Sequence, residues 1–239
     1  MKKHKIKILL GLVLILIILT GGFMLYASVF YHANDQANKV LQTGLKEQSI
    51  EVDHDLTVFG ERDHNDVGFI FYPGAKVEAI AYVPFLNELS KHGITCILVD
   101  MPLHMAIFNS SAAKNIQEQY PDIKTWYIGG HSMGGAMASK YVAEHKSEMK
   151  GLILLGAYLY GDVDASKSLT LYGSEDQVIN REKIDYSTNV HQIKGGNHAG
   201  FGNYGKQKGD GEATISSEAQ QGIAIDYILD FMGKNIKDN

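Results

Sequence analysis

One serine lies between glycines at the point where an apolar segment meets a helix-like segment. Gly130-His131-Ser132-Met133-Gly134 follows the apolar run "TWYIGG" and precedes "GGAMASKYVAEH". A sharp strand-to-helix turn forces its central residue into an unfavourable backbone region, and the residues two before and two after then nearly touch. Only glycine fits at those two positions. The spacing therefore predicts a nucleophile elbow that pushes the Ser132 hydroxyl out above a sheet.

A serine hydroxyl is a weak nucleophile until a neighbouring base takes its proton. In chains with this elbow, the orienting acid and then the histidine follow the serine along the sequence. Asp176 comes after the apolar run "SLTLYG", and His198 comes after "NVHQIKGG". We therefore expect Ser132 to be the nucleophile, His198 the general base and Asp176 the acid that orients the imidazole.

The choice of acid leaves alternatives open. In "YGSEDQV" the acid three residues after the glycine can turn back towards the histidine, which favours Asp176. We expect Val178 to anchor this loop in the core. Glu175 remains an alternative, as do Asp162 and Asp164 after the preceding strand.

The choice among ten histidines rests on position. His198 alone lies downstream of the acid and after a strand, among Gly195, Gly196 and Gly200, which let its loop fold over a site. The His131 side chain, inside the elbow, should point away from the serine. No two histidines have a metal-ligand spacing such as H-x-x-x-H, so we expect no metal. The serine chemistry inferred for these residues implies no cofactor.

Acyl transfer also needs N–H donors for the negative oxygen that forms on the attacked carbonyl. One is the backbone N–H of Met133, at the amino terminus of the expected helix. The second should come from the loop in "FIFYPGAKVEAIAY", where Pro73 and Gly74 give a tight turn. Ala75 is the expected donor and Lys76 the alternative; a plain strand–helix turn is the interpretation without chemistry.

The elements that position these residues alternate along the chain. From about residue 50, short β-rich apolar runs, typical of strands buried on both faces, alternate with amphipathic segments. This order predicts an α/β fold with a mostly parallel, doubly wound sheet flanked by helices, whose ligands bind beyond the carboxyl ends of the strands. "EVDHDLTVF" should be an edge strand, and the expected helices are Ala79–Lys91, Ala112–Gln119, Gly134–His145, Arg181–Tyr186 and Ser216–Ile236.

The amino terminus has a different character. Four lysines within the first seven residues precede an apolar run from Ile8 to about Phe30. About 20 such residues in a helix span a bilayer core of roughly 30 Å. The run is longer than the apolar part of a cleavable signal, although "LYA" ending at Ala27 is a weak cleavage site. This favours an uncleaved transmembrane anchor with its lysines in the cytoplasm over a secreted, cleaved form.

Three regions follow from this pattern: a membrane anchor over 1–30, a linker or stalk helix over 31–50 and a catalytic domain over 51–239. Without the four leading lysines the chain holds 18 basic and 27 acidic residues, a charge of about −9. Such an acidic domain is a poor nucleic-acid binder. The single cysteine, Cys96, excludes an internal disulfide and should be a buried core residue.

The motifs "YPGAKV", "GGHSMGG", "YGSEDQV" and "GGNHAGFGNYG" resemble the α/β-hydrolase superfamily from about Val67 to the carboxyl terminus, and within it the small dienelactone-hydrolase-like group. The resemblance implies Ser132 as nucleophile, Asp176 as orienting acid and His198 as base. Dienelactone hydrolases proper use a cysteine, so the serine here argues against that substrate. Only "LYGDVDASK" stands where many members insert a helical lid, which predicts an open site.

Together these features predict a membrane-anchored, extracytoplasmic serine hydrolase that cleaves a carboxylic ester of a small-molecule or lipid-like kind. The same parts serve acyltransferases, thioesterases and amidases. A catalytically silent hydrolase fold that acts as a binding module is the alternative from another class.

Overall fold

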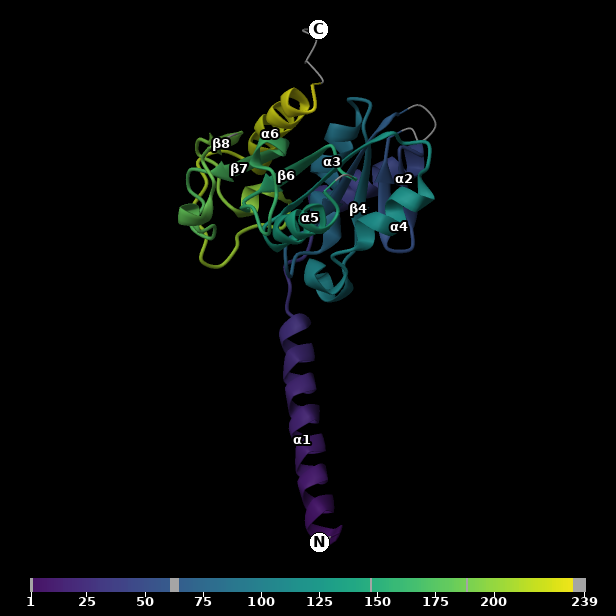
Figure 1. Cartoon of the computed structure of the whole chain (residues 1–239). Coiled ribbons are helices and arrows are strands. Elements are labelled where there is room, and N and C mark those ends of the chain that lie inside the picture. The colour runs from purple at the N-terminus through teal and green to yellow at the C-terminus, as the bar shows by residue number, and fades with distance from the viewer. Residues whose placement is uncertain (1, 61–64, 147, 188, 234–239) are drawn as a thin grey trace. The chain divides into compact units, whose positions relative to one another are not determined.

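The computed structural model describes residues 2–60, 65–146, 148–187 and 189–233. The chain forms two units, Met1–Phe30 and Tyr31–Asn239. The first contains helix α1 (Lys2–Ala27) (Figure 1). Its stretch Lys5–Ala27, with a mean hydropathy of 2.9, is long and apolar enough to cross a membrane.

The second unit is built on one eight-stranded sheet with the order β1-β2-β4-β3-β5-β6-β7-β8. Strands β3 to β8 are parallel, whereas β1 and β2 form an antiparallel hairpin at one edge. The single edge strand predicted for "EVDHDLTVF" is therefore wrong, because the chain turns back at His54, which has a φ of 53°. The strands are β1 (Ile50–Asp53), β2 (Leu56–Phe59), β3 (Val67–Tyr72), β4 (Thr95–Val99), β5 (Thr125–His131), β6 (Gly151–Leu155), β7 (Ser168–Gly173) and β8 (Val190–Ile193).

Helices cover both faces of this sheet, as expected for a doubly wound fold (Figure 1). Alternate residues of β3 belong to different cores: Phe69 and Phe71 pack with α2, α3 and α6, whereas Ile70 and Tyr72 pack with α4 and α5. The helices are α2 (Asp35–Glu47), α3 (Val83–Ser90), α4 (Ala112–Gln119), α5 (Met133–Glu144) and α6 (Ser217–Phe231).

Three helix predictions differ from the structure. The expected helix 79–91 is a 3₁₀ turn, Ala79–Tyr82, followed by α3, with a proline in the first turn where a missing N–H does no harm. The expected helix 181–186 is only a 3₁₀ turn, Arg181–Lys183. The helix predicted to reach Ile236 ends at Phe231; Met232 and Gly233 form a turn, in which Gly233 has a φ of 69°, and residues 234–236 lie outside the described residues.

Residues 31–50, which we expected to form a linker or stalk, contribute α2 to the second unit. The Asn34 side chain caps this helix by accepting the Ala37 N–H at 3.0 Å. Ala37, Leu41 and Gly44 are buried. A Cβ on Gly44 would overlap the side chain of Ile50, so the glycine allows close packing of α2 on β1.

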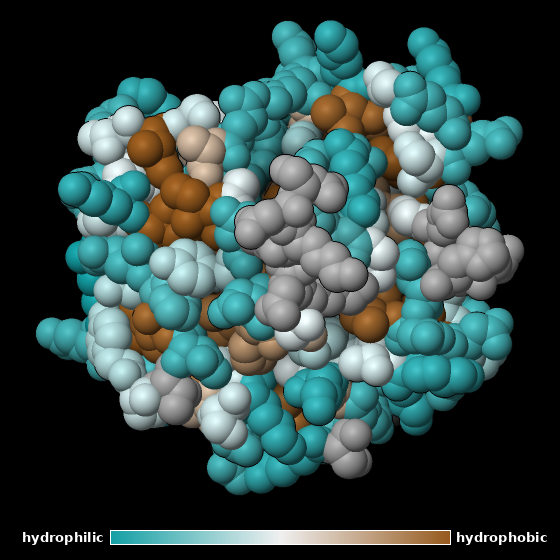
Figure 2. All heavy atoms as spheres, turned by 90° about the horizontal axis from the view of Figure 1, so that it is seen from above, coloured by the Kyte–Doolittle hydropathy of each residue, from teal (hydrophilic) through white to brown (hydrophobic). Residues whose placement is uncertain are grey.

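Residues 156–167, between β6 and β7, contain only the short 3₁₀ helix Ala165–Lys167. No α-helix is inserted in this fully described stretch, which is compatible with the predicted absence of a lid. Figure 2 shows another face of the protein, which is mainly hydrophilic with small, separate hydrophobic patches.

The fold brings the candidate residues to one edge of the sheet. Ala75 follows β3, Ser132 follows β5, Asp176 follows β7 and His198 follows β8. Because these strands are parallel, their carboxyl ends all lie at the same edge.

Candidate active site

The backbone at Ser132 has the geometry that the glycine spacing predicts. Ser132 has φ 53° and ψ −122° and directly precedes the first residue of α5. A Cβ on Gly130 would lie 2.5 Å from the Tyr72 carbonyl oxygen and 2.6 Å from the carbonyl carbon of Gly134. A Cβ on Gly134 would overlap the carbonyl oxygens of Tyr72 and Pro73. Larger residues at either position would collide with backbone, which cannot rotate away.

An acid and a histidine pair next to this elbow. The Nδ1 of His198 lies 2.8 Å from Oδ2 of Asp176, and both side chains are buried. The other carboxylate oxygen accepts the N–H groups of Val178 and Ile179, each at 2.9 Å. An ionised carboxylate only accepts, so Nδ1 carries the proton and Nε2 of His198 is the basic nitrogen.

The histidine lies close to the serine. Ser132 N–H donates to the Leu155 carbonyl at 2.9 Å. A Cβ on the next residue, Gly156, would lie 2.9 Å from His198 Nδ1 and 3.4 Å from Asp176 Oδ2. Nε2 of His198 is buried and has no hydrogen-bond partner among the described residues, so the hydroxyl of Ser132 does not bond to it in this structure. Catalytic hydrogen bonds of this kind often tighten only when substrate binds.

The loop after β3 distinguishes between its two candidate oxyanion donors. Lys76 N–H donates to the His104 carbonyl at 2.7 Å, which occupies that donor. Gly74 N–H donates to the Tyr82 hydroxyl at 3.1 Å. Between them, Ala75 N–H has no acceptor among the described residues. Of the alternatives in the sequence, the geometry thus favours Ala75 over Lys76.

The other candidate donor is Met133, the first residue of α5. The first N–H groups of an α-helix have no acceptor inside the helix, and the helix dipole makes this end attractive to negative charge. An oxyanion bound next to Ser132 would therefore meet a donor that needs no rearrangement.

The alternative acids do not pair with His198. Glu175 accepts a hydrogen bond from the Ser174 hydroxyl at 2.7 Å. Asp162 and Asp164 are exposed in the connection between β6 and β7. Only Asp176, of the four carboxylates considered, faces the imidazole.

Our prediction that Val178 anchors the acid loop is wrong, because its side chain is 39% exposed. Arg181 holds the loop instead. Its Nη2 donates to the carbonyl oxygens of Ser174 at 2.7 Å and Asp176 at 2.9 Å. The arginine therefore fixes the backbone of the acid loop from outside the core.

Sequence reasoning missed the residues that hold the histidine loop, Lys194–Ile215. Gln220 on α6 is fully buried, accepts the Asn197 N–H at 3.0 Å and donates to the Asn197 carbonyl at 2.8 Å. The neighbouring Gln221 donates to the Gly200 carbonyl at 3.2 Å. Two adjacent glutamines in the first half of α6 were the available signal.

Asp210 is a second residue that we did not single out. Its Oδ2 accepts the N–H of Ala199, next to His198, at 2.9 Å. Its Oδ1 accepts the N–H of Gln177, next to Asp176, at 3.4 Å. Asp210 thus ties the histidine loop to the acid loop. The signal was an acid within the glycine-rich stretch "KGDGE".

His131 lies against the candidate base. The rings of His131 and His198 are 4.5 Å apart between centroids, tilted by 48°. Nδ1 of His131 lies 2.8 Å from the Tyr82 hydroxyl, which already accepts the Gly74 N–H and so donates to the imidazole. Burial, together with the charge of the neighbouring His198, holds the pKa of His131 well below its usual value. His131 is therefore a neutral neighbour of the base.

The loop after β4 borders the oxyanion loop and exposes apolar side chains. The His104 carbonyl accepts the Lys76 N–H, and Leu103 and His104 both have positive φ, 55° and 54°. Leu103, Ile107 and Phe108 are exposed on this segment. The segment that exposes these apolar side chains is therefore bonded to the residue after Ala75.

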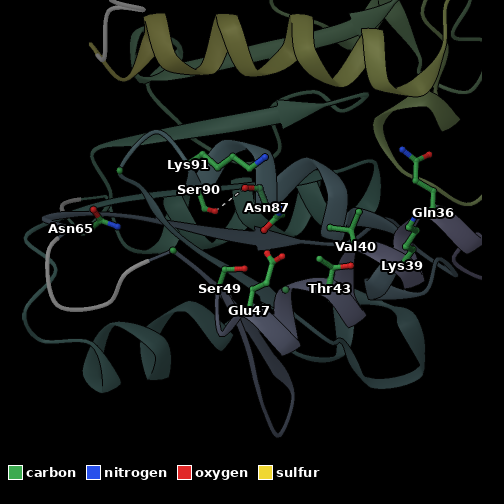
Figure 3. Close-up of a pocket in the computed structure, with 13 residues that line it drawn as sticks. Gln36, Lys39, Val40, Thr43, Glu47, Ser49, Asn65, Asn87, Ser90 and Lys91 are labelled. Carbon is green, nitrogen blue, oxygen red and sulfur yellow. Dashed lines mark hydrogen bonds between the residues drawn. The ribbon is translucent and has the colours of Figure 1, made fainter.

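A large hollow elsewhere on the unit is not this site. It has a volume of about 810 Å³ and is lined by α2, α3 and adjoining turns (Figure 3). None of Ser132, Asp176 and His198 lines it. The side chains labelled in Figure 3 offer no nucleophile paired with a base; they are Gln36, Lys39, Val40, Thr43, Glu47, Ser49, Asn65, Asn87, Ser90 and Lys91.

A model of the alpha/beta hydrolase family matches residues 68–222, which include the elbow, the acid and the histidine. The chain belongs to this family. No curated protein sequence matches it significantly.

Solved structures share the hydrolase fold at low sequence identity. Est1E from Butyrivibrio proteoclasticus, in a structure with ferulic acid bound, is 13% identical, with a TM-score of 0.56 over 77% of this chain and 97% of that one. A monoacylglycerol lipase from Paleococcus ferrophilus is 12% identical, with a TM-score of 0.56 over 74% and 98%. A predicted CIB-like hydrolase from Thermoplasma acidophilum is 14% identical, with a TM-score of 0.51 over 76% and 96%. At these identities the likeness concerns the fold.

Proposed function

We propose that this alpha/beta hydrolase is a serine esterase in which Ser132, His198 and Asp176 form the catalytic triad. The observation that supports it most is the buried Asp176–His198 pair: Nε2 of the histidine has no partner among the described residues, and its ring lies against His131, the residue before Ser132 on the strained elbow.

In this mechanism the Ser132 oxygen attacks the ester carbonyl carbon while Nε2 of His198 takes the hydroxyl proton. Asp176 holds the imidazole in the required tautomer and stabilises the imidazolium. When the tetrahedral intermediate collapses, the alcohol leaves with that proton and the acyl group stays on Ser132. Water, activated by the same imidazole, then releases the acid and restores the serine.

Met133 and Ala75 donate their N–H groups to the oxyanion of each tetrahedral intermediate. The Ala75 N–H supports this role because it has no acceptor among the described residues, whereas the N–H groups of Gly74 and Lys76 both have one. Loss of one such donor typically costs roughly 10²–10³ in rate.

The substrate we propose is a carboxylic ester with an apolar acyl group. The exposed Leu103, Ile107 and Phe108, on the segment whose His104 carbonyl accepts the Lys76 N–H, support it, as do Est1E with bound ferulic acid and a monoacylglycerol lipase among the proteins of the same fold. Acyl transfer to an alcohol, thioester cleavage and amide cleavage would use the same groups. A series of p-nitrophenyl esters of increasing chain length tests the preference; flat rates across the series would contradict an apolar acyl site.

Fluorophosphonate labelling tests the enzyme itself. We expect one adduct, on Ser132, and we expect Ser132→Ala to abolish labelling and lower ester turnover by several orders of magnitude with the melting temperature preserved. A folded chain without an adduct or turnover would instead indicate a silent binding module.

Asp176→Asn tests the choice of acid, with Glu175→Gln as the matched control. The first change should lower kcat by roughly 10³–10⁴, because it favours the wrong imidazole tautomer. The second neutralises the adjacent acid and should leave kcat nearly unchanged. The reverse result would move the role to Glu175.

We further propose that α1 is an uncleaved anchor and that the catalytic unit lies outside the cytoplasm. The apolar stretch Lys5–Ala27 and the four lysines before or at its start support this arrangement. Amino-terminal sequencing of the protein from its native host tests it: a mature start near Ser28 or Asn34 would indicate secretion.

A further inference from the structure

The segment 31–34, which directly precedes α2, forms backbone hydrogen bonds with the loop that carries Ala75. Tyr31 N–H donates to the Lys76 carbonyl at 2.7 Å, and Glu78 N–H donates to the Tyr31 carbonyl at 2.9 Å. Tyr31 thereby forms an isolated parallel β-bridge with Val77, two residues after Ala75. The backbone of the proposed oxyanion loop is thus paired on this side with residues from the start of the unit.

A side chain of the same loop holds the segment a second time. Oε2 of Glu78 accepts the N–H of Ala33 at 2.8 Å. A hydrogen bond from a backbone N–H to an ionised acceptor is stronger than one between neutral groups. This contact therefore fixes the segment two residues beyond the bridge.

The other side of the segment contacts the histidine loop. Asn34 N–H donates to the Asn203 carbonyl at 2.8 Å. The Tyr31 hydroxyl accepts the Lys208 N–H at 3.0 Å, and its ring lies 5.6 Å from that of Tyr204 between centroids. The segment thus spans the two loops that carry Ala75 and His198.

Neither loop has regular secondary structure between Gly74 and Glu78 or between Gly202 and Ile215. Their relative position depends on contacts such as these, together with the Asn203 N–H, which donates to the Ala81 carbonyl at 2.8 Å. A displacement of about 1 Å in a catalytic constellation can lower the rate by roughly 10². We propose that segment 31–34 is a positioning element of the active site, which holds the oxyanion donor of Ala75 in register with His198. This inference rests on the proposed function and adds to it a dependence on residues that immediately follow the apolar helix.

The consequence concerns processing at the amino terminus. A chain that begins at Ser28 keeps every contact of the segment, whereas one that begins at Asn34 lacks the β-bridge, the Tyr31 ring and the Ala33 N–H. The two cleaved forms should differ in activity although both contain Ser132 and His198.

The test uses the full chain in detergent, with kcat and KM measured on one p-nitrophenyl ester. Glu78→Ala should lower kcat about tenfold with little change in KM, because it frees the Ala33 N–H without touching the substrate. Glu78→Gln keeps an oxygen acceptor and should restore most of the rate. Glu47→Ala, which removes an exposed acid from the far end of α2, is the control and should have no effect.

A second pair of variants tests the contact between the Tyr31 side chain and the histidine loop. Tyr31→Ala removes the ring and the hydroxyl, whereas Tyr31→Phe removes only the hydroxyl; we expect a larger fall in kcat for the first. If both sites act through one segment, Tyr31→Ala and Glu78→Ala together should lower kcat by less than the product of their separate effects. Should Tyr31→Ala fail to fold, the Glu78 pair decides.

Fluorophosphonate labelling of the unmodified chain separates the two proposals. If Ser132 is not labelled, the proposed function fails, and this inference fails with it. If Ser132 is labelled but Glu78→Ala and Tyr31→Ala keep the kcat of the unmodified chain, the inference alone is overturned. A fall in melting temperature without a fall in kcat would equally overturn it, because the segment would then be only a structural brace.

Discussion

The nucleophile elbow and the histidine loop meet at one site but are held in different ways. The elbow is five consecutive residues fixed by the near contact of its own glycines with backbone. The histidine loop runs over more than twenty residues. Side chains from inside and outside the loop hold it: Asp210 within it, Gln220 and Gln221 from α6 and Tyr31 from the start of the unit.

This difference decides how each part responds to change. At the elbow, strain is local and backbone atoms block any added carbon, so one substitution should be severe. In the histidine loop several hydrogen bonds together hold His198 in position, so loss of one should displace this base while the domain stays folded.

The largest effect should come from Gly134→Ala. Its Cβ would overlap the carbonyl oxygens of Tyr72 and Pro73, which belong to a buried strand end and cannot rotate away. We expect a loss of roughly 1–3 kcal/mol in the free energy of unfolding or more, together with loss of fluorophosphonate labelling. Urea unfolding monitored by circular dichroism measures it.

Gly222→Ala is the matched control for that change. Gly222 lies inside α6, and a Cβ there would meet nothing within 4 Å. It should stabilise the chain by roughly 0.5–1 kcal/mol, because alanine loses less backbone entropy in a helix. If the two variants behaved alike, the steric account of the elbow would be wrong.

An intermediate effect is expected from Gln220→Ala in the histidine loop. It leaves the N–H and the carbonyl of Asn197 without these partners, but because Asn197 is only partly buried, water replaces part of both bonds and we expect a total cost of roughly 1 kcal/mol. We expect kcat to fall about tenfold while labelling of Ser132 slows but persists. Gln42→Ala, an exposed glutamine on α2, serves as control; complete loss of folding in Gln220→Ala would show that the loop and the fold are not separable.

The smallest effect should come from His131→Asn, where elbow and histidine loop touch. The pKa of His131 is lowered in the folded state, so below the ordinary value of about 6.5 the unfolded chain binds a proton that the folded chain does not. Stability must then fall as pH falls, by at most about 1.4 kcal/mol per pH unit from this group.

The Oδ1 of asparagine can replace Nδ1 as acceptor for the Tyr82 hydroxyl, whereas it cannot bind a proton at these pH values. His198, Tyr204 and Phe201 also face this ring. The variant should therefore lose less stability than the unmodified chain between pH 7.5 and pH 5 in thermal melts. Parallel curves would contradict a buried, neutral His131.

Sequence reasoning succeeded where the determinants are local. The elbow followed from two glycines, and α4 begins and ends at the predicted residues, Ala112 and Gln119. The parallel sheet followed from apolar runs too short for helices. These features depend on backbone geometry and periodicity within about ten residues.

Prediction from the sequence failed where the conformation depends on a contact with a residue far away in the chain. Residues 181–186 were expected to form a helix, whereas only Arg181–Lys183 form a 3₁₀ turn and the Arg181 guanidinium binds the acid loop. Val178 was expected in the core although the loop is held from outside. The hydrogen bonds that Asp210 accepts from both loops join residues up to 33 positions apart, and no local sequence pattern predicts such contacts.

Gly156 carries a consequence for how hydrolases of this kind lose activity. Its φ of 54° and the missing side chain make room for the imidazole and carboxylate of the acid–base pair. Gly156→Ala would add a methyl group that pushes the acid and the histidine apart, although all three residues of the proposed triad would still be present in the sequence. The presence of Ser132, Asp176 and His198 in a sequence is therefore not sufficient for activity; a glycine directly after β6 is a fourth requirement.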